Sequence, residues 1–236
     1  MKICEYIGGS HLYCLNTASS DVDKRFVFLN TEVSEIIGLE RHDSDCKQTK
    51  GEDSAGWELR HFLRMCRKCN SAALEALFNE DWVHIDPLFK SSVLDNRLQL
   101  IDSKNIYFSL RGYLKSELNA SRGRTTGKLG AIRKVQVEKY GYSPKSMMNA
   151  IRLALTGERF FKDNVYSNKP EAHFRETLLR IKTDPEGFNA DDLERWVEDL
   201  EESIKHYFKE RNQDYKFDNG VANEICKQFY LPFLIS

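Results

Sequence analysis

Residues 6–29 read YIGGSHLYCLNTASSDVDKRFVFL, and this stretch decides which fold we expect. It leaves an apolar run through Gly-Gly-Ser and then places Asp21 and Asp23 one residue apart before a second apolar run. Residues 2–7 and 24–29 have the composition of strands. The sequence therefore predicts two strands joined by a polar connection. An ordinary surface loop is the alternative, because Gly, Ser, Asn and Asp are common in loops.

The two aspartates predict a metal site if they begin a strand. Alternate side chains of a strand share a face, so Asp21 and Asp23 would lie side by side while Val22 points to the core. Two adjacent carboxylates need a compensating cation, and Mg²⁺ prefers such oxygen ligands together with substrate phosphates. A third converging carboxylate would allow two ions to assist an in-line phosphoryl transfer.

Glu75 and the Gly-Ser turn are the other candidates. Glu75 is the one carboxylate in the apolar run ALEALF, where a charge is costly unless something binds it. The alternative is that ALEALF continues a helix and that Glu75 lies on its solvated face. Gly9 and Ser10 follow the first strand, where backbone N–H groups and the Ser hydroxyl could hold triphosphate oxygens.

The remaining chain predicts a mixed α/β N-terminal half and an all-helical C-terminal half. Residues 31–56 are polar and charged and predict an exposed loop. Residues 57–70 predict an amphipathic helix, and from residue 86 onward the apolar spacing is mostly helical. The last long helical run begins at Asn189, which predicts an N-cap followed by two aspartates in the first turn.

The composition limits the classes of partner. The 236 residues include 35 Lys+Arg and 36 Asp+Glu, for a net charge of -1, so nucleic acid would have to bind a local patch. No apolar run approaches the length of a membrane span, and we expect a cytoplasmic protein without a membrane partner. Six scattered cysteines suggest reduced thiols, and the C-x-x-C at Cys66 and Cys69 predicts packed or half-exposed thiols rather than a zinc site.

Several motifs together resemble a known family. G-S followed by D-x-D resembles the DNA polymerase beta-like nucleotidyltransferase superfamily, and GSHLYCLNTASSDVDKRFVFL looks like its branch of predicted nucleotidyltransferases encoded near RNA ligases in bacteria and phages. WELRHFLRMCRKCNSAALEALF and YGYSPKSMMNAIRLALTGERFF are similar to later segments of that branch. The resemblance covers residues 6–182 and departs from the family pattern at Cys14, Ala18, Phe26 and Asn149. We expect Cys14 and Phe26 to flank the nucleotide loop and to alter substrate preference.

The resemblance implies an α+β fold with a small mixed sheet and flanking helices, followed by an all-helical C-terminal half. It implies a nucleotidyltransferase catalytic domain at residues 1–100 and a helical domain that closes the cleft at residues 101–236. The implied ligands of two Mg²⁺ ions, with Mn²⁺ as the alternative, are the carboxylates Asp21, Asp23 and Glu75. The implied nucleotide-binding residues are Gly9, Ser10, Arg25, Lys145 and Arg152.

Each basic candidate has a structural alternative. Arg25 could bind a triphosphate or simply neutralise the aspartates. Lys145, Asn149 and Arg152 share one helix face, which is ordinarily solvated. The segment SRGRTTGKLGAIRK, residues 121–134, holds five basic residues and no acid, and it could guide a nucleic-acid backbone or be a plain surface loop.

The implied activity is transfer of a nucleoside monophosphate from an NTP such as ATP to an acceptor hydroxyl, with release of pyrophosphate. A carboxylate, with Glu75 as one candidate, would accept the proton of that hydroxyl. Family context suggests RNA as the acceptor, and host cytoplasm as the location if a phage encodes the chain. The alternatives are a non-catalytic module that binds a nucleotide or a partner, and an unrelated fold in which D-x-D is accidental. The preferred base and the oligomeric state are left open.

Overall fold

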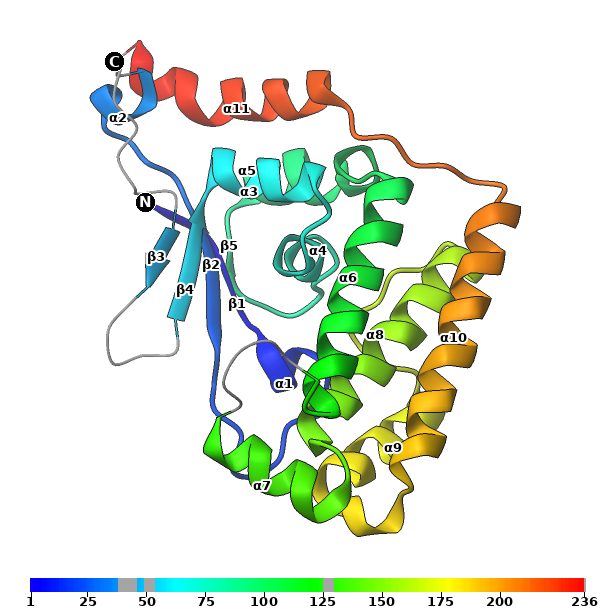
Figure 1. Ribbon diagram of the computed structural model, residues 1–236. Coiled ribbons are helices and arrows are strands. Elements are labelled where there is room, and N and C mark those ends of the chain that lie inside the picture. Colours follow the sequence, from blue (N-terminus) through cyan, green and yellow to red (C-terminus); the bar gives the residue numbers. More distant parts are fainter. Residues whose placement is uncertain (38–45, 49–53, 125–129, 236) are drawn as a thin grey trace. The chain divides into compact units, whose positions relative to one another are not determined.

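A mixed sheet forms the N-terminal part of the protein. The computed structural model describes residues 1–37, 46–48, 54–124 and 130–235. Within these ranges the sheet has five strands in the order β3-β4-β2-β1-β5 (Figure 1). Its members are β1 (Lys2–Ile7), β2 (Lys24–Phe28), β3 (Cys46–Gln48), β4 (Ser54–Glu58) and β5 (Trp82–Ile85). Strand β1 is antiparallel to β2 and β5, β2 is parallel to β4, and β4 is antiparallel to β3.

Helices make up most of the described chain after the sheet. They are α1 (Gly9–Leu12), α2 (Val33–Ile37), α3 (Leu59–Arg67), α4 (Ser71–Leu77), α5 (Pro87–Phe89), α6 (Ser103–Ser121), α7 (Ala131–Tyr140), α8 (Pro144–Asp163), α9 (Ala172–Thr183), α10 (Ala190–Glu210) and α11 (Asn219–Leu234). A π-helical turn η1 (Lys90–Leu94) and the 3₁₀ turns η2 (Arg97–Leu100) and η3 (Pro185–Gly187) complete the set. The predicted α+β class, with a small mixed sheet and a helical C-terminal half, is confirmed.

The chain divides into two compact units. Unit 1 comprises Met1–Ile106 and Asp214–Ser236, and unit 2 comprises Tyr107–Gln213. The C-terminal segment thus belongs to the unit that contains the sheet, where α11 packs on α2, α3 and η2. The predicted domains 1–100 and 101–236 place this segment with the helical domain. Ser103 N donates to Tyr215 O at 3.0 Å, and Asp218 N donates to Gln99 O at 2.8 Å. These bonds fix the returning segment to unit 1.

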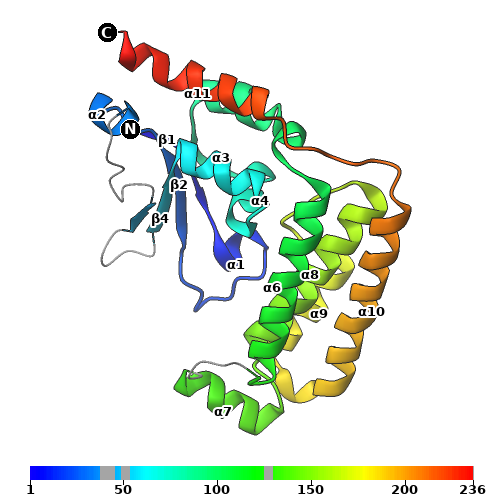
Figure 2. The same ribbon diagram turned by 45° about the horizontal axis from the view of Figure 1, so that its top comes forward.

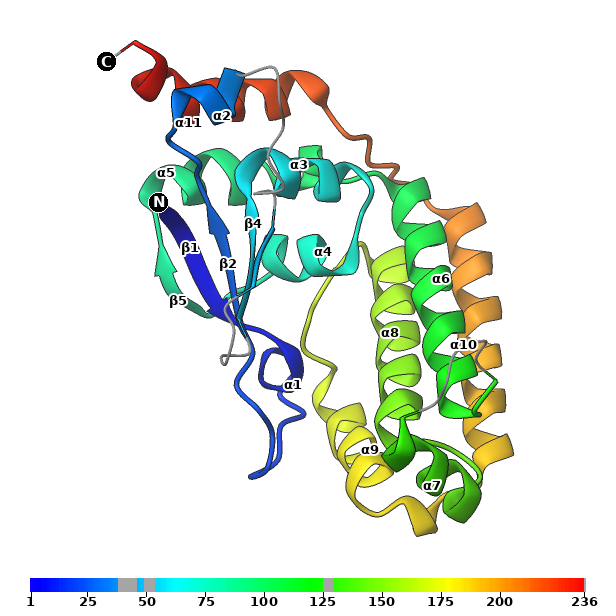
Figure 3. The ribbon, with the colours of Figure 1, turned by 60° about the vertical axis from the view of Figure 1, so that its left-hand side comes forward.

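In unit 1 the core lies between the sheet and the helices on one of its faces. Helix α3 packs on β2 and β4, and Figure 3 shows α4 on the same face. Helix α11 lies along α2 and α3. It is held by Tyr230, whose hydroxyl donates a hydrogen bond to Glu58, a carboxylate that is 1% exposed. Glu58 also caps α3 by accepting from Arg60 N at 2.9 Å.

Unit 2 is a bundle in which α8 packs against α9 and α10 (Figure 2). Close packing is possible at Gly157 of α8, where a Cβ atom would overlap the side chain of Leu110 and lie 3.1 Å from Cδ1 of Ile204. Asn189 caps α10 by accepting from Asp191 N at 2.8 Å and Asp192 N at 3.2 Å, as the sequence predicts. Among the described residues, no helix is both long and apolar enough to cross a bilayer.

Two local predictions need correction. Residues 31–56 contain helix α2 and strands β3 and β4, and the rest of this predicted loop, 38–45 and 49–53, lies outside the described residues. The helix predicted to begin at Trp57 begins at Leu59, because residues 54–58 pair with β2 as a strand. Backbone pairing with a distant strand outweighs helical spacing here.

Candidate functional site

The pairing of β1 with β2 brings the Gly-Ser turn to the D-x-D pair. Ile7, the last residue of β1, is paired with Lys24, the first residue of β2. One residue beyond this pair, Gly8 N donates a hydrogen bond to Asp23 O at 2.7 Å. Residues separated by fifteen positions in the sequence are thus adjacent in unit 1.

Gly9 leaves the space that the Asp23 carboxylate occupies. Its φ angle is +61°, in the left-handed region that favours glycine. A Cβ atom at Gly9 would overlap Oδ2 of Asp23 and lie 3.0 Å from its Cγ. At Gly8, a Cβ atom would lie 2.9 Å from Cγ of Arg25. The two glycines therefore let the acidic and the basic side chain lie directly against the turn.

Asp23 and Arg25 form an ion pair beside this turn. Nη2 of Arg25 lies 3.2 Å from Oδ1 of Asp23, and both side chains are 26% exposed. This ion pair neutralises the charge of Asp23, and binding of a triphosphate by Arg25 stays a prediction. Asp21 is exposed and has no hydrogen bond or ion pair within the described part of the chain. Val22 is 51% exposed and not in the core as predicted, because residues 21–23 precede β2 instead of belonging to it.

Glu75 lies in α4 and faces the residue that ends α1. The hydroxyl of Tyr13 donates a hydrogen bond to Oε1 of Glu75. The neighbouring Tyr6 is fully buried, and its pKa is raised well above the usual value, first by burial and then by the charge of Glu75. Glu75 is half-buried and has a hydrogen-bond partner. It therefore does not lie on a solvated helix face, as the alternative predicts. Ligation of a metal by Glu75 together with the aspartates stays a prediction.

Ser10 and His11 complete the turn. Ser10 O accepts a hydrogen bond from Leu15 N at 2.8 Å, which closes the segment after α1. The hydroxyl of Ser10 has no hydrogen bond to any other described residue, so it is available to a ligand. Nε2 of His11 is buried without a hydrogen-bond partner among the described residues. His11 and Tyr13 were not among the predicted site residues, although both follow Ser10 within the stretch GSHLY.

The helical candidates belong to unit 2. Lys145 is exposed in the first turn of α8, whereas Arg152 on the same helix face is buried, with 7% of its surface exposed. Lys182 at the end of α9 has a lowered pKa, because it is partly buried and close to the charge of Lys145. A role of Lys145 and Arg152 in nucleotide binding stays a prediction.

The basic segment at residues 121–134 is partly neutralised. Arg122 pairs with Asp191 at 2.6 Å and with Glu194 at 3.1 Å. Arg124 pairs with Glu194 at 2.6 Å. These acids come from α10, which is distant in the sequence. The absence of acids from the segment itself therefore did not mean that its arginines lack acidic partners. Residues 125–129 lie outside the described residues.

Comparison with known proteins identifies the family. A family model described as RlaP, RNA repair pathway DNA polymerase beta family, matches residues 4–226. This chain belongs to the RlaP family. No curated protein and no solved structure matches the chain. The match includes both units and extends beyond the resemblance seen in the sequence, into α11.

The donor set of this RlaP chain fits a hard divalent cation bound together with phosphate. The described residues contain no group of three or more His, Cys, Asp or Glu side chains that could hold a metal ion by themselves. Mg²⁺, however, is commonly held by one or two carboxylates plus substrate phosphates. Asp23 and the exposed Asp21 are carboxylates of this kind, and the Asp23 carboxylate lies directly against the glycine turn.

One departure from the family pattern has a structural explanation. Phe26 lies in β2, with 9% of its surface exposed. Its effect on substrate preference stays a prediction. Its ring covers Gly56, the residue paired with it in β4, and a Cβ atom at Gly56 would overlap that ring. The large residue in β2 is thus matched by the smallest residue in β4.

Proposed function

We propose that this RlaP-family protein transfers a nucleoside monophosphate from an NTP to a hydroxyl of RNA. The hydroxyl oxygen forms a bond to the α-phosphorus. The bond between the α-phosphorus and the oxygen that bridges it to the β-phosphorus breaks, and pyrophosphate leaves with that oxygen. The hydroxyl proton passes to a carboxylate of the site, for which Glu75 is the candidate. RNA as the acceptor follows the RNA repair pathway in the family's description.

One observation carries the proposal, namely the contact between the Gly8-Gly9 turn and Asp23. Backbone N–H groups in a glycine turn bind phosphate oxygens, and a carboxylate directly beside them holds a cation where those oxygens lie. Phosphoryl transfer depends mainly on positioning and on neutralised charge, so this small set of groups is sufficient. Mg²⁺ or Mn²⁺ held by Asp21 and Asp23 would neutralise the charge that develops on the phosphates.

Two variants test the proposal. Asp21→Asn with Asp23→Asn removes two charges while preserving side-chain shape. The variant also loses the ion pair of Asp23 with Arg25, so thermal melts without metal check that it stays folded. We expect loss of Mg²⁺-dependent NTP binding in calorimetric titrations and loss of label transfer from each labelled NTP to RNA. Glu198→Gln with Asp199→Asn is the matched control, because these exposed acids of α10 have no partner among the described residues.

The third carboxylate is tested in the same assay. Glu75→Gln should abolish transfer, while Tyr13→Phe, which removes the hydrogen bond to Glu75, should preserve it. Asp53→Asn is the comparison variant, because Ser54 and Lys24 are paired in the sheet, and Asp53 precedes Ser54 in the sequence as Asp23 precedes Lys24. Transfer that survives Glu75→Gln but not Asp53→Asn would contradict the assignment of Glu75.

The alternative of a non-catalytic module makes a different prediction. A binding module of the same fold would bind MgNTP through the aspartates but would label no RNA. Equal MgNTP binding by wild type and by the double aspartate variant would contradict both functions of the site.

A further inference from the structure

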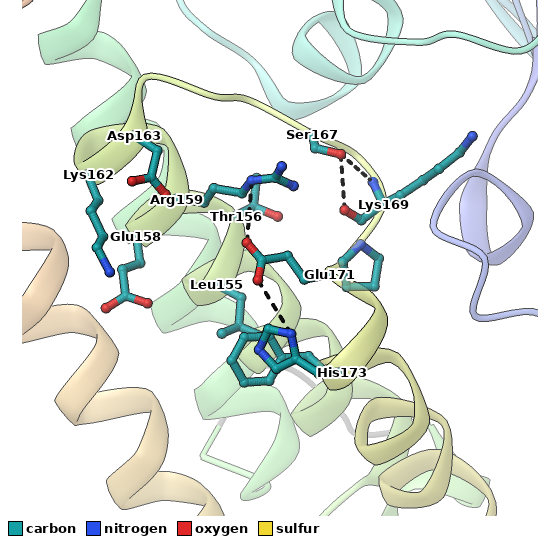
Figure 4. Close-up of a pocket in the computed structure, with 12 residues that line it drawn as sticks. Leu155, Thr156, Glu158, Arg159, Lys162, Asp163, Ser167, Lys169, Glu171 and His173 are labelled. Atoms are coloured by element: carbon teal, nitrogen blue, oxygen red, sulfur yellow. Dashed lines mark hydrogen bonds and ion pairs between the residues drawn. The ribbon is translucent and has the colours of Figure 1, made fainter.

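Unit 2 contains a pocket that none of the residues discussed so far line. It lies between the C-terminal half of α8, the segment that follows it, and the start of α9 (Figure 4). Its volume is about 210 Å³, below the roughly 300–1,000 Å³ typical of pockets for drug-sized ligands. A single ring system fits such a space, whereas a whole nucleoside triphosphate does not.

Glu171 lies at the centre of this pocket. It occupies the N-cap position of α9, but its side chain makes no cap hydrogen bond, so the carboxylate does not satisfy the first N–H groups of the helix. Instead the carboxylate lies between Arg159 and His173 (Figure 4). Oε1 is 3.5 Å from Nε of Arg159, and Oε2 is 3.5 Å from Nδ1 of His173. Both distances exceed a normal hydrogen bond, so both oxygens can still accept one.

The walls combine apolar surface with the hydroxyl groups of Thr156 and Ser167. Leu155 and Thr156 line the pocket and are buried, with 8% and 7% of their surfaces exposed. Phe174 contributes a ring, which lies 3.9 Å from the ring of His173 between centroids. Aromatic and apolar surface of this kind suits the face of a flat ring, while Glu171 and Arg159 suit its polar edge.

The charges around the pocket balance. Arg159, Lys162 and Lys169 are matched by Glu158, Asp163 and Glu171. Glu158 is further engaged by Ser203, whose hydroxyl donates to it at 2.6 Å. A balanced pocket favours a neutral ligand over an anion such as a phosphate.

We propose that this pocket binds a guanine base of single-stranded RNA. Guanine carries two adjacent N–H donors, on N1 and N2, next to the acceptor O6. The two oxygens of Glu171 accept from the donors, and Arg159 donates to O6. Adenine, cytosine and uracil each lack one of these adjacent donors. The guanine site is inferred from the residues of the pocket alone, whereas RNA as the molecule that contains the base rests on the proposed function.

Binding of labelled RNA pentamers tests the proposal. The probes are UUGUU, UUAUU and UUIUU, in which inosine lacks the N2 amino group, measured by fluorescence anisotropy with the full chain in EDTA. We expect UUGUU to bind roughly tenfold more tightly than the other two. Glu171→Gln should remove this preference, whereas Glu176→Gln, an exposed glutamate of α9 that has no partner among the described residues, should retain it.

The controls separate this proposal from the catalytic one. The variant with both Asp21→Asn and Asp23→Asn should keep the preference for UUGUU, because the assay contains neither metal nor NTP. Equal binding of the three pentamers, or a preference that survives Glu171→Gln, would overturn the guanine site. Competition by free GMP as strong as that by UUGUU would retain the guanine site but overturn RNA as its source.

Discussion

Gly9 is required by a neighbour that is remote in the sequence. A backbone at φ +61° can be adopted by other residues at some cost, but the space for a side chain is taken by the carboxylate of Asp23. Any larger residue must move that carboxylate or the turn. The position of the Asp23 carboxylate relative to the backbone of the glycine turn therefore depends on the absence of a side chain at Gly9.

Gly9→Ala tests this dependence. We expect a loss of stability of about 1–2 kcal/mol from the left-handed backbone and a loss of MgNTP affinity of roughly tenfold or more from the displaced carboxylate. Thermal melts and calorimetric titrations measure the two effects separately.

Gly112→Ala is the control for that substitution. Gly112 lies within α6, and a Cβ atom there would meet nothing within 4 Å. Alanine is a better helix former than glycine, so this variant should be more stable by about 0.5–1 kcal/mol with unchanged nucleotide binding. Unchanged MgNTP affinity in Gly9→Ala would show that the Asp23 carboxylate is not part of the nucleotide site.

At the scale of elements, the parallel pair β2–β4 determines the central part of the sheet. Phe26 and Gly56 are directly paired, and the phenyl ring covers the glycine. Cross-strand pairs of this kind contribute to register, because a shifted strand would place a side chain where the ring now lies. The same pairing explains why residues 54–58 form a strand although their sequence continues into a helix.

Gly56→Ala should collide with the Phe26 ring and destabilise the protein by about 1–3 kcal/mol, the usual cost of overpacking. In a Phe26→Ala background the space is open, and the same substitution should cost less than about 0.5 kcal/mol. Urea unfolding of the four proteins of this cycle measures the coupling. A cost that is equal in both backgrounds would mean that the two residues are not in contact.

At the scale of the whole molecule, unit 2 is inserted into unit 1. The chain leaves unit 1 after Ile106 and returns at Asp214. Close to both points, Tyr215 N donates to Oγ of Ser103 at 2.9 Å, and Ser103 N donates to Tyr215 O at 3.0 Å. The two ends of the insertion are thus held together by bonds that belong to unit 1.

This arrangement predicts that unit 1 folds alone. Replacing Tyr107–Gln213 with a linker of about six Gly and Ser residues should bridge the gap, since such a linker spans roughly 13 Å. We expect a single cooperative transition in urea, with circular dichroism retaining both strand and helix signals. A gradual transition would show that unit 1 needs unit 2 to fold.

Local patterns in the sequence determined much of the protein. Strands β1 and β2 and the long helices follow from composition and apolar spacing, and the cap at Asn189 follows from its own side chain. The approach of the Gly-Ser turn to the D-x-D pair was also accessible, because the two strands that carry them are consecutive and pair antiparallel. The residues in these contacts are close to each other in the sequence, so a local pattern is enough to predict that they meet.

Only the tertiary structure decided the pairings between distant segments. Strand β4 is a strand because β2 lies beside it, and α11 belongs to unit 1 because Tyr230 reaches the buried Glu58. Three further features likewise join segments that are distant in the sequence or depend on how a side chain is oriented. They are the ion pairs of Arg122 with α10, the hydrogen bond from Tyr13 to Glu75 and the orientation of Glu171. These features depend on which surfaces meet in the folded chain, and no spacing within a single segment encodes that meeting.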